Sequence, residues 1–83
     1  MSVQEELKSF IVQNFLFSTD LSRLGDADSL LEKGIVDSTG ILELVTHIEE
    51  KYGIRVMDQE MLPANLDSVN AIAGFIERKR SNS

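Results

Sequence analysis

The residue of this chain best placed for chemistry is Ser38, which ends the sequence Gly-Ile-Val-Asp-Ser at residues 34–38. Asp, Ser and Thr favour the first positions of a helix, and a glycine such as Gly53 commonly follows the last turn. We therefore predict a helix over residues 38–52 that begins at Ser38. Backbone N–H groups at such an end lack partners and attract negative charge, so a serine there could carry a phosphate ester. A simple helix cap would explain the same residue.

The predicted helix has two different faces. At about 100° per residue, its apolar side chains gather on one buried face, which comprises Ile41, Leu44, Val45, Ile48 and Tyr52. The rest of its surface offers hydroxyl, apolar and acidic side chains: Thr39, Leu42, Glu43, Thr46, Glu49 and Glu50. This surface is either a solvated helix face or a docking surface for basic protein partners, with Leu42 as its apolar anchor.

Composition removes several classes of function. The chain has 83 residues. The absence of cysteine excludes disulfides and thiolate metal sites, and the presence of one histidine, His47, excludes multi-histidine metal sites. Residues 26–60 hold nine acids and three bases, so this window carries the whole formal charge of −6. An acidic centre argues against nucleic-acid binding, which needs a basic stripe. No apolar run approaches the roughly 20 residues of a membrane span, and residues 1–6 lack the features of a signal peptide. We expect one cytoplasmic domain over residues 1–83 without membrane insertion or a bound metal.

Apolar periodicity predicts an all-α fold. The expected helices span about residues 3–17, 38–52, 58–62 and 67–80, which makes a small bundle of three main helices and one short helix. Pro63 is expected to close the short helix and Asp67 to cap the last one. A long loop follows the first helix, and it contains a short segment capped by Asp28 or Ser29 and ended by Gly34.

The sequence at residues 34–38, followed by an acidic helix ending Glu-Glu-Lys-Tyr-Gly-Ile at residues 49–54, resembles the acyl and peptidyl carrier proteins. The resemblance extends from the first helix through Arg80. It implies a small four-helix bundle in which Ser38 carries 4′-phosphopantetheine, transferred from coenzyme A by a phosphopantetheinyl transferase. It also implies that Asp37 helps to place the magnesium ion of that transferase. The resemblance implies that the chain itself is not an enzyme and has no catalytic residue. Activation of Ser38 would come from the transferase, since no adjacent His or Lys can act as its base.

Within this family, residues 37–41 and 66–72 look most like the D-alanyl and free-standing aminoacyl carriers. Fatty-acid carriers usually have Leu directly after the serine, and this chain has Thr39. The resemblance thus implies a monomeric carrier of an aminoacyl thioester, loaded by an adenylating ligase or another acyl-loading enzyme and unloaded by an acyltransferase or synthase. Two alternatives stay open, a fatty-acid or polyketide acyl carrier and an unmodified acidic adaptor. A Ser38→Ala variant separates the carriers from the adaptor.

Two further expectations concern cargo and specificity. The bulky residues expected between the helices should fill the interior and leave little room for a long acyl chain: Ile41, Val45, Ile54, Val56, Met61, Leu62 and Ile72. Ser29 and Ser68 also follow an aspartate, but neither opens an acidic helix. We therefore expect only Ser38 to be modified.

Overall fold

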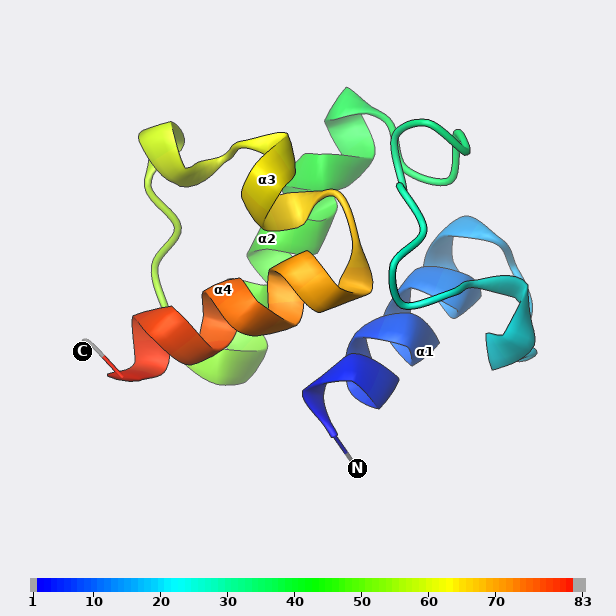
Figure 1. Cartoon of the computed structure of the whole chain (residues 1–83), viewed down its shortest axis with the longest axis horizontal. Coiled ribbons are helices and arrows are strands. Elements are labelled where there is room, and N and C mark those ends of the chain that lie inside the picture. Colours follow the sequence, from blue (N-terminus) through cyan, green and yellow to red (C-terminus); the bar gives the residue numbers. More distant parts are fainter. Residues whose placement is uncertain (1, 82–83) are drawn as a thin grey trace.

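The computed structural model describes residues 2–81, which are helical wherever they are regular (Figure 1). Its helices are α1 (Val3–Phe15), α2 (Ser38–Tyr52), α3 (Pro63–Leu66) and α4 (Val69–Ser81), with single 3-10 turns η1 (Leu21–Arg23) and η2 (Asp58–Glu60). Over residues 2–81 there is no strand, and none of the helices is long and apolar enough to cross a membrane. The predicted all-α bundle of three main helices and one short helix, with a long loop after the first, is confirmed.

The hydrophobic core lies where α1, α2 and α4 meet. In Figure 1, α4 crosses in front of α2, and α1 lies to one side of both. Each helix contributes an apolar stripe at steps of three and four residues, and the buried members are Leu7, Ile11, Val12, Leu44, Val45, Ile48, Val69, Ile72, Ala73, Phe75 and Ile76. The loops add Leu24, Leu30, Val36 and Val56, and α3 adds Leu66. The loop before α2 is therefore part of the packed structure.

Local capping explains where α1 and α2 begin and end. Asp37 and Gly53 flank α2 as expected, because Gly53 has a φ of +65° and its N–H donates to Glu49 O over 3.0 Å. The prediction that α1 extends to residue 17 is wrong by two residues. Phe17 takes a left-handed conformation with a φ of +53°, and Ser18 N–H then donates back to Val12 O over 3.1 Å.

Two expectations for the second half of the chain are wrong. Pro63 begins α3 instead of closing a helix over residues 58–62, because the first position of a helix needs no N–H donor. The last helix begins at Val69. Its first turn is capped by Ser68 and not by Asp67, since Ser68 Oγ accepts from Ala71 N–H over 3.1 Å. Asp67 is used elsewhere, as described below.

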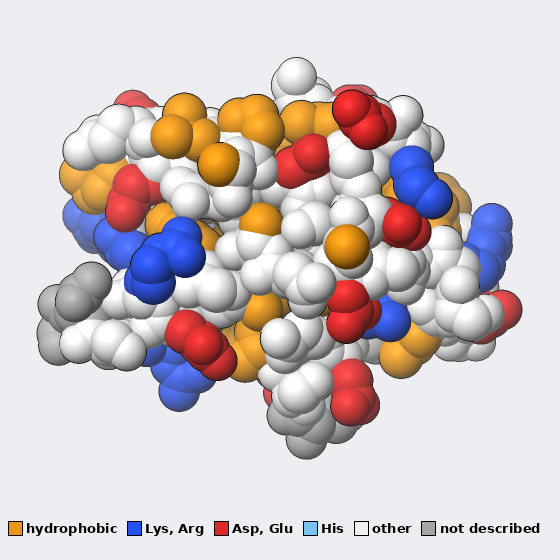
Figure 2. All heavy atoms as spheres, in the orientation of Figure 1, with side chains coloured by type: hydrophobic (Ala, Val, Ile, Leu, Met, Phe, Trp, Pro, Cys, Tyr) orange, Lys and Arg blue, Asp and Glu red, His pale blue; other side chains and the backbone are white. Residues whose placement is uncertain are grey.

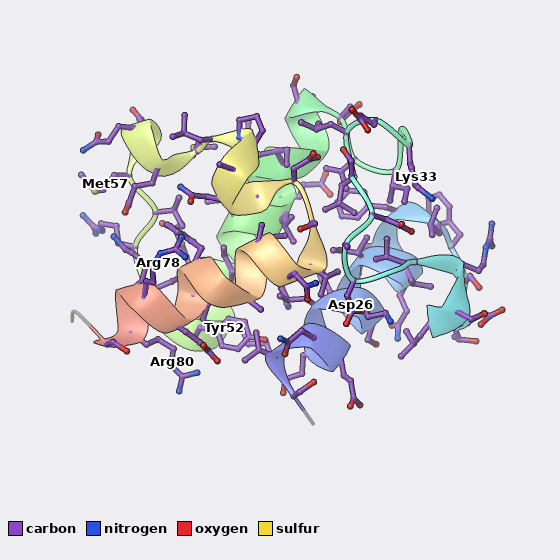
Figure 3. The ribbon with its side chains drawn as sticks, in the orientation of Figure 1. Asp26, Lys33, Tyr52, Met57, Arg78 and Arg80 are labelled. Atoms are coloured by element: carbon purple, nitrogen blue, oxygen red, sulfur yellow. The ribbon has the colours of Figure 1, made fainter. Side chains whose placement is uncertain are left out.

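Polar contacts tie the helix ends together around this core. Figure 3 shows Tyr52 near the end of α2, where its hydroxyl donates to Glu6 Oε2 of α1 over 2.7 Å. This hydrogen bond lowers the pKa of Glu6, and burial together with the same bond raises the pKa of Tyr52. Asp26, in the loop beside α1, pairs with Lys8 Nζ at 2.9 Å. These contacts fix α1 against its neighbours at the edge of the core.

Candidate functional site

Ser38 is the first residue of α2, and its side chain is exposed to solvent. Its hydroxyl makes no hydrogen bond with any residue in the described part of the chain. The backbone reaches it through a tight turn in which Gly34 has a φ of +68° and Val36 is buried. The hydroxyl is therefore presented outward from a backbone that is itself well anchored.

Asp37 is the N-cap of α2, and Ser38 is not. Asp37 Oδ1 accepts from Gly40 N–H over 2.7 Å, and Asp37 O accepts the first intrahelical bond, from Ile41 N–H over 2.9 Å. The earlier N–H groups of the helix have no intrahelical partner and give this end a partial positive charge. A phosphate ester on Ser38 would lie at this positive end. The single observed bond of the Asp37 carboxylate leaves its second oxygen for another partner.

Gly40 lets the first turn of α2 lie directly against α1. Gly40 is buried, and a Cβ atom there would lie 2.9 Å from Phe15 Cε1 and 3.0 Å from Val36 Cγ1. Neither distance is compatible with an undisturbed carbon contact. Sequence reasoning missed this role, because a glycine inside a helix pattern carries no signal about what packs against it.

A half-open cleft of about 210 Å³ lies next to Ser38, between the start of α2 and α3. Its walls are mostly apolar, and the residues that line it are Leu31, Ser38, Ile41, Met61, Leu62, Pro63, Leu66 and Asp67. Three residues expected to fill the interior, Ile41, Met61 and Leu62, line this surface cleft, whereas Val45, Val56 and Ile72 are buried in the core. The cleft thus offers a mostly apolar surface with Ser38 and Asp67 among its lining residues, and this lining is compatible with the methyl and methylene groups of a pantetheine arm.

Most of the residues expected to dock partners face solvent along α2. Thr39, Leu42, Glu43, Thr46 and Glu50 are exposed, and Leu42 is 57% exposed. Glu49 is half-buried, and its Oε2 accepts from Val56 N–H over 2.9 Å, so this carboxylate braces the connector after α2. Figure 2 shows hydrophobic side chains along the upper edge of the molecule, over η2, α3 and the start of α2. Leu62 of that region is 51% exposed.

The other two serines that follow an aspartate have different surroundings. Ser29 Oγ donates to Asp67 Oδ2 over 2.5 Å and accepts from Glu32 N–H over 3.1 Å. Ser68 Oγ accepts from Ala71 N–H, as noted above, and both serines are half-buried. Of the three Asp-Ser serines, Ser38 alone is exposed and has no hydrogen bond to other described residues.

Comparison with known proteins identifies the family. The family model described as "Phosphopantetheine attachment site" matches residues 16–76, which include the cleft and the start of α2. The chain is 33% identical over 78 residues to a D-alanyl carrier protein of Streptococcus suis, covering 93% of this chain and 95% of that protein. It is also 29% identical over 82 residues to an acyl carrier protein of Campylobacter hominis, covering 99% of each. The resemblance to carrier proteins is thus confirmed, and the chain belongs to the phosphopantetheine attachment family, whose members are non-catalytic carrier modules that hold 4′-phosphopantetheine covalently.

Proposed function

We propose that Ser38 is the residue that carries 4′-phosphopantetheine and that the chain holds an activated acyl or aminoacyl group for partner enzymes. One observation carries this proposal: Ser38 is exposed at the positive end of α2, beside a half-open, mostly apolar cleft and inside the matched region. When bound, the group supplies the thiol for a thioester, which the chain needs because it has no cysteine.

The residues of this chain divide the task at the site. Ser38 Oγ would attack the pantetheine-bearing phosphorus of coenzyme A, so that a phosphate ester forms at Ser38 while the pyrophosphate P–O bond breaks and 3′,5′-ADP leaves. The proton of the hydroxyl must pass to a base outside the chain. No described side chain accepts a hydrogen bond from this hydroxyl, so the transferase has to provide that base. Asp37 Oδ1 holds the helix start through Gly40 N–H at 2.7 Å. The other oxygen of Asp37 would be available to the magnesium ion that the transferase uses.

The cargo we propose is an amino acid or another short acyl group. The D-alanyl carrier relative and Thr39 after the serine both support this choice. The cleft volume of about 210 Å³ lies below the roughly 300–1,000 Å³ of ordinary ligand pockets, which favours a short acyl group over a long chain. The acyl carrier relative keeps a fatty-acid or polyketide cargo as the second candidate.

We propose that partners dock on the exposed face of α2, defined by Thr39, Leu42, Glu43, Thr46 and Glu50. Exposed carboxylates next to an apolar side chain suit an enzyme surface with basic residues around an apolar pocket. The partners would be the phosphopantetheinyl transferase, an adenylating or acyl-loading enzyme, and a downstream acyltransferase or synthase. Glu49 contributes less to this face than the sequence suggests, because its carboxylate is held by Val56 N–H.

The decisive experiment is modification followed by peptide mapping. The chain is incubated with coenzyme A, magnesium and a phosphopantetheinyl transferase, and its intact mass is measured. We expect one adduct on Ser38, none in Ser38→Ala, and an unchanged extent of modification in the matched control Ser68→Ala. An adduct mapped to Ser29 or Ser68 would overturn the assignment.

Loading of the modified chain then tests the cargo. The pantetheinylated protein is charged with D-alanine in one sample and with an eight-carbon acyl group in another, and amide chemical shifts are compared. We expect similar shifts for Ile41 in both samples, because it lines the cleft beside Ser38, and only small shifts for Ile72, because it is fully buried in the core. Large shifts at these two residues with the eight-carbon group alone would mean that the bundle opens to enclose the chain, and would favour the fatty-acid alternative.

A further inference from the structure

Asp67 accepts hydrogen bonds from residues far away in the sequence, which the sequence pattern did not predict. Its Oδ2 accepts from Ser29 Oγ over 2.5 Å and its Oδ1 accepts from Leu31 N–H over 2.9 Å. Its backbone oxygen accepts from Leu30 N–H over 2.7 Å. One half-buried residue at the junction of α3 and α4 thus binds three consecutive residues that lie 36–38 positions earlier in the chain.

These bonds hold the segment that leads into the modification site. We call residues 29–36 the strap, and Figure 1 shows it lying beside the connection between α3 and α4. Leu30 O accepts from both Ile35 N–H at 3.0 Å and Val36 N–H at 3.2 Å. The backbone oxygen of Asp67 thus holds Leu30, and its carboxylate holds the residues on either side, Ser29 and Leu31. Leu30 in turn holds the end of the strap, and the next two residues are Asp37 and Ser38.

Apart from these bonds, the strap is held by apolar packing near its two ends, and little else holds its middle. Leu30 and Val36 are its buried side chains, whereas residues 31–34 are exposed and Gly34 has a φ of +68°. A carboxylate that accepts hydrogen bonds binds more strongly than a neutral group in the same place. Removing it would leave Leu31 N–H without this partner and free the middle of the strap to move.

We propose that Asp67 is a positioning residue for the modification of Ser38, acting through the strap and not by contact with the transferred group. This inference rests on the proposed function, because it names what holds Ser38 in place for the transferase. It also gives a role to a residue that lines the cleft without serving as the cap of α4.

The test compares Asp67→Ala with Asp67→Asn and with two controls. Asp58→Ala removes an exposed carboxylate from η2 and matches the change of charge. Ile76→Val weakens the core within α4, at a residue that is fully buried, and matches a general loss of stability. Each variant is measured in two ways: amide hydrogen exchange along the chain, and steady-state modification with coenzyme A, magnesium and a transferase.

We expect Asp67→Ala to lower the exchange protection of Leu31 by roughly tenfold, since a charge-assisted bond of this kind contributes about that factor. Protection of Leu30 and Val36 should fall by less, because their N–H groups bond backbone oxygens that the variant keeps. Ile11 of α1 lies in the core, so its exchange protection reports the global stability. In Asp67→Ala this protection should fall no more than it does in Ile76→Val. The kcat/KM for modification should fall by about the same factor as the protection of Leu31, which neither control should show. Asp67→Asn should recover part of both losses, because its side-chain oxygen can still accept from Leu31 N–H.

Three results would count against the inference. Unchanged protection of the strap in Asp67→Ala would show that the bonds do not hold it. Lost protection with an unchanged kcat/KM would show that the strap does not position Ser38. An equal loss of kcat/KM in Ile76→Val would reduce the effect to stability. If the unaltered chain is not modified at Ser38, it is the proposed function that fails. The hydrogen-exchange data alone then show whether Asp67 holds the strap.

Discussion

The contact between Gly40 and Phe15 offers a test of how the start of α2 is seated against α1. In a Gly40→Ala variant, the new methyl group would lie 2.9 Å from Phe15 Cε1 and 3.0 Å from Val36 Cγ1. Carbon atoms prefer separations of about 3.5–4.0 Å, so both neighbours would have to move. Phe15 cannot rotate away freely, because its ring packs edge-on against Phe10 with the ring centroids 6.1 Å apart.

The size of the effect follows from two opposing contributions. Overpacking of a filled contact costs about 1–3 kcal/mol. Replacing a glycine inside a helix by alanine contributes roughly 0.5–1 kcal/mol in the other direction. We expect a net loss of about 1 kcal/mol in the free energy of unfolding, which corresponds to a fall of about 4–8 °C in Tm for a domain of this size. Modification of Ser38 should slow as well, because the displaced turn carries it.

Urea and thermal unfolding followed by circular dichroism measure the loss, and a double-mutant cycle assigns it. In a Phe15→Leu background the ring carbon is gone, so Gly40→Ala should cost about 1 kcal/mol less than it does in the unaltered chain. A Gly40→Ala variant with a raised Tm, or a cost that is the same in both backgrounds, would refute the reasoning. The first result would mean that helix propensity outweighs the contact, and the second that Phe15 does not cause the strain.

Two further predictions concern charge. Reversing two exposed carboxylates, Glu43→Lys with Glu50→Lys, should slow loading by partner enzymes at low salt but leave unfolding unchanged, because exposed charges steer association and are screened over about 10 Å at 0.1 M salt. Reversal of Glu77 on α4 is the control, and equal loading kinetics for both variants would place the docking face elsewhere. His47 stacks on Phe10 with ring centroids 3.8 Å apart, and burial lowers the pKa of His47 below 6.5. The unfolded chain therefore binds a proton at His47 more readily than the folded chain does. The unfolding free energy should fall as the pH drops below about 6.5, the pKa of histidine in the unfolded chain. Urea unfolding at about pH 7.5 and about pH 5.5 should show a smaller change in His47→Gln, and an equal change would contradict this assignment.

The signals that located the candidate site in the sequence are local. Asp37 caps the N–H group of Gly40, three residues later, and Gly53 ends the same helix by its own backbone conformation. Interactions of this range depend on residues within one turn, so their residue types alone predict where a helix begins and ends. The exposed position of Ser38 and the apolar face of α2 follow from the same pattern.

Local signals were ambiguous where a residue fits two roles. Pro63 can follow a helix or begin one, and the structure uses it at the first position of α3. Phe17 continues the apolar pattern of α1 but lies outside the helix, because its backbone has a φ of +53°. Its side chain is 87% exposed and takes no part in the core. Periodicity does not distinguish these outcomes, since both are compatible with the same spacing of apolar residues.

The sequence by itself thus determined the helical class, the start of α2 at Ser38 and the acidic surface that runs along this helix. Only the tertiary structure decided what surrounds that serine. The cleft combines Leu31, Ile41 and Met61 from separate parts of the chain, and Asp67 is bonded to residues 36–38 positions away. The physical reason is that such contacts depend on how the helices pack, and helix propensity and capping act only over neighbouring residues.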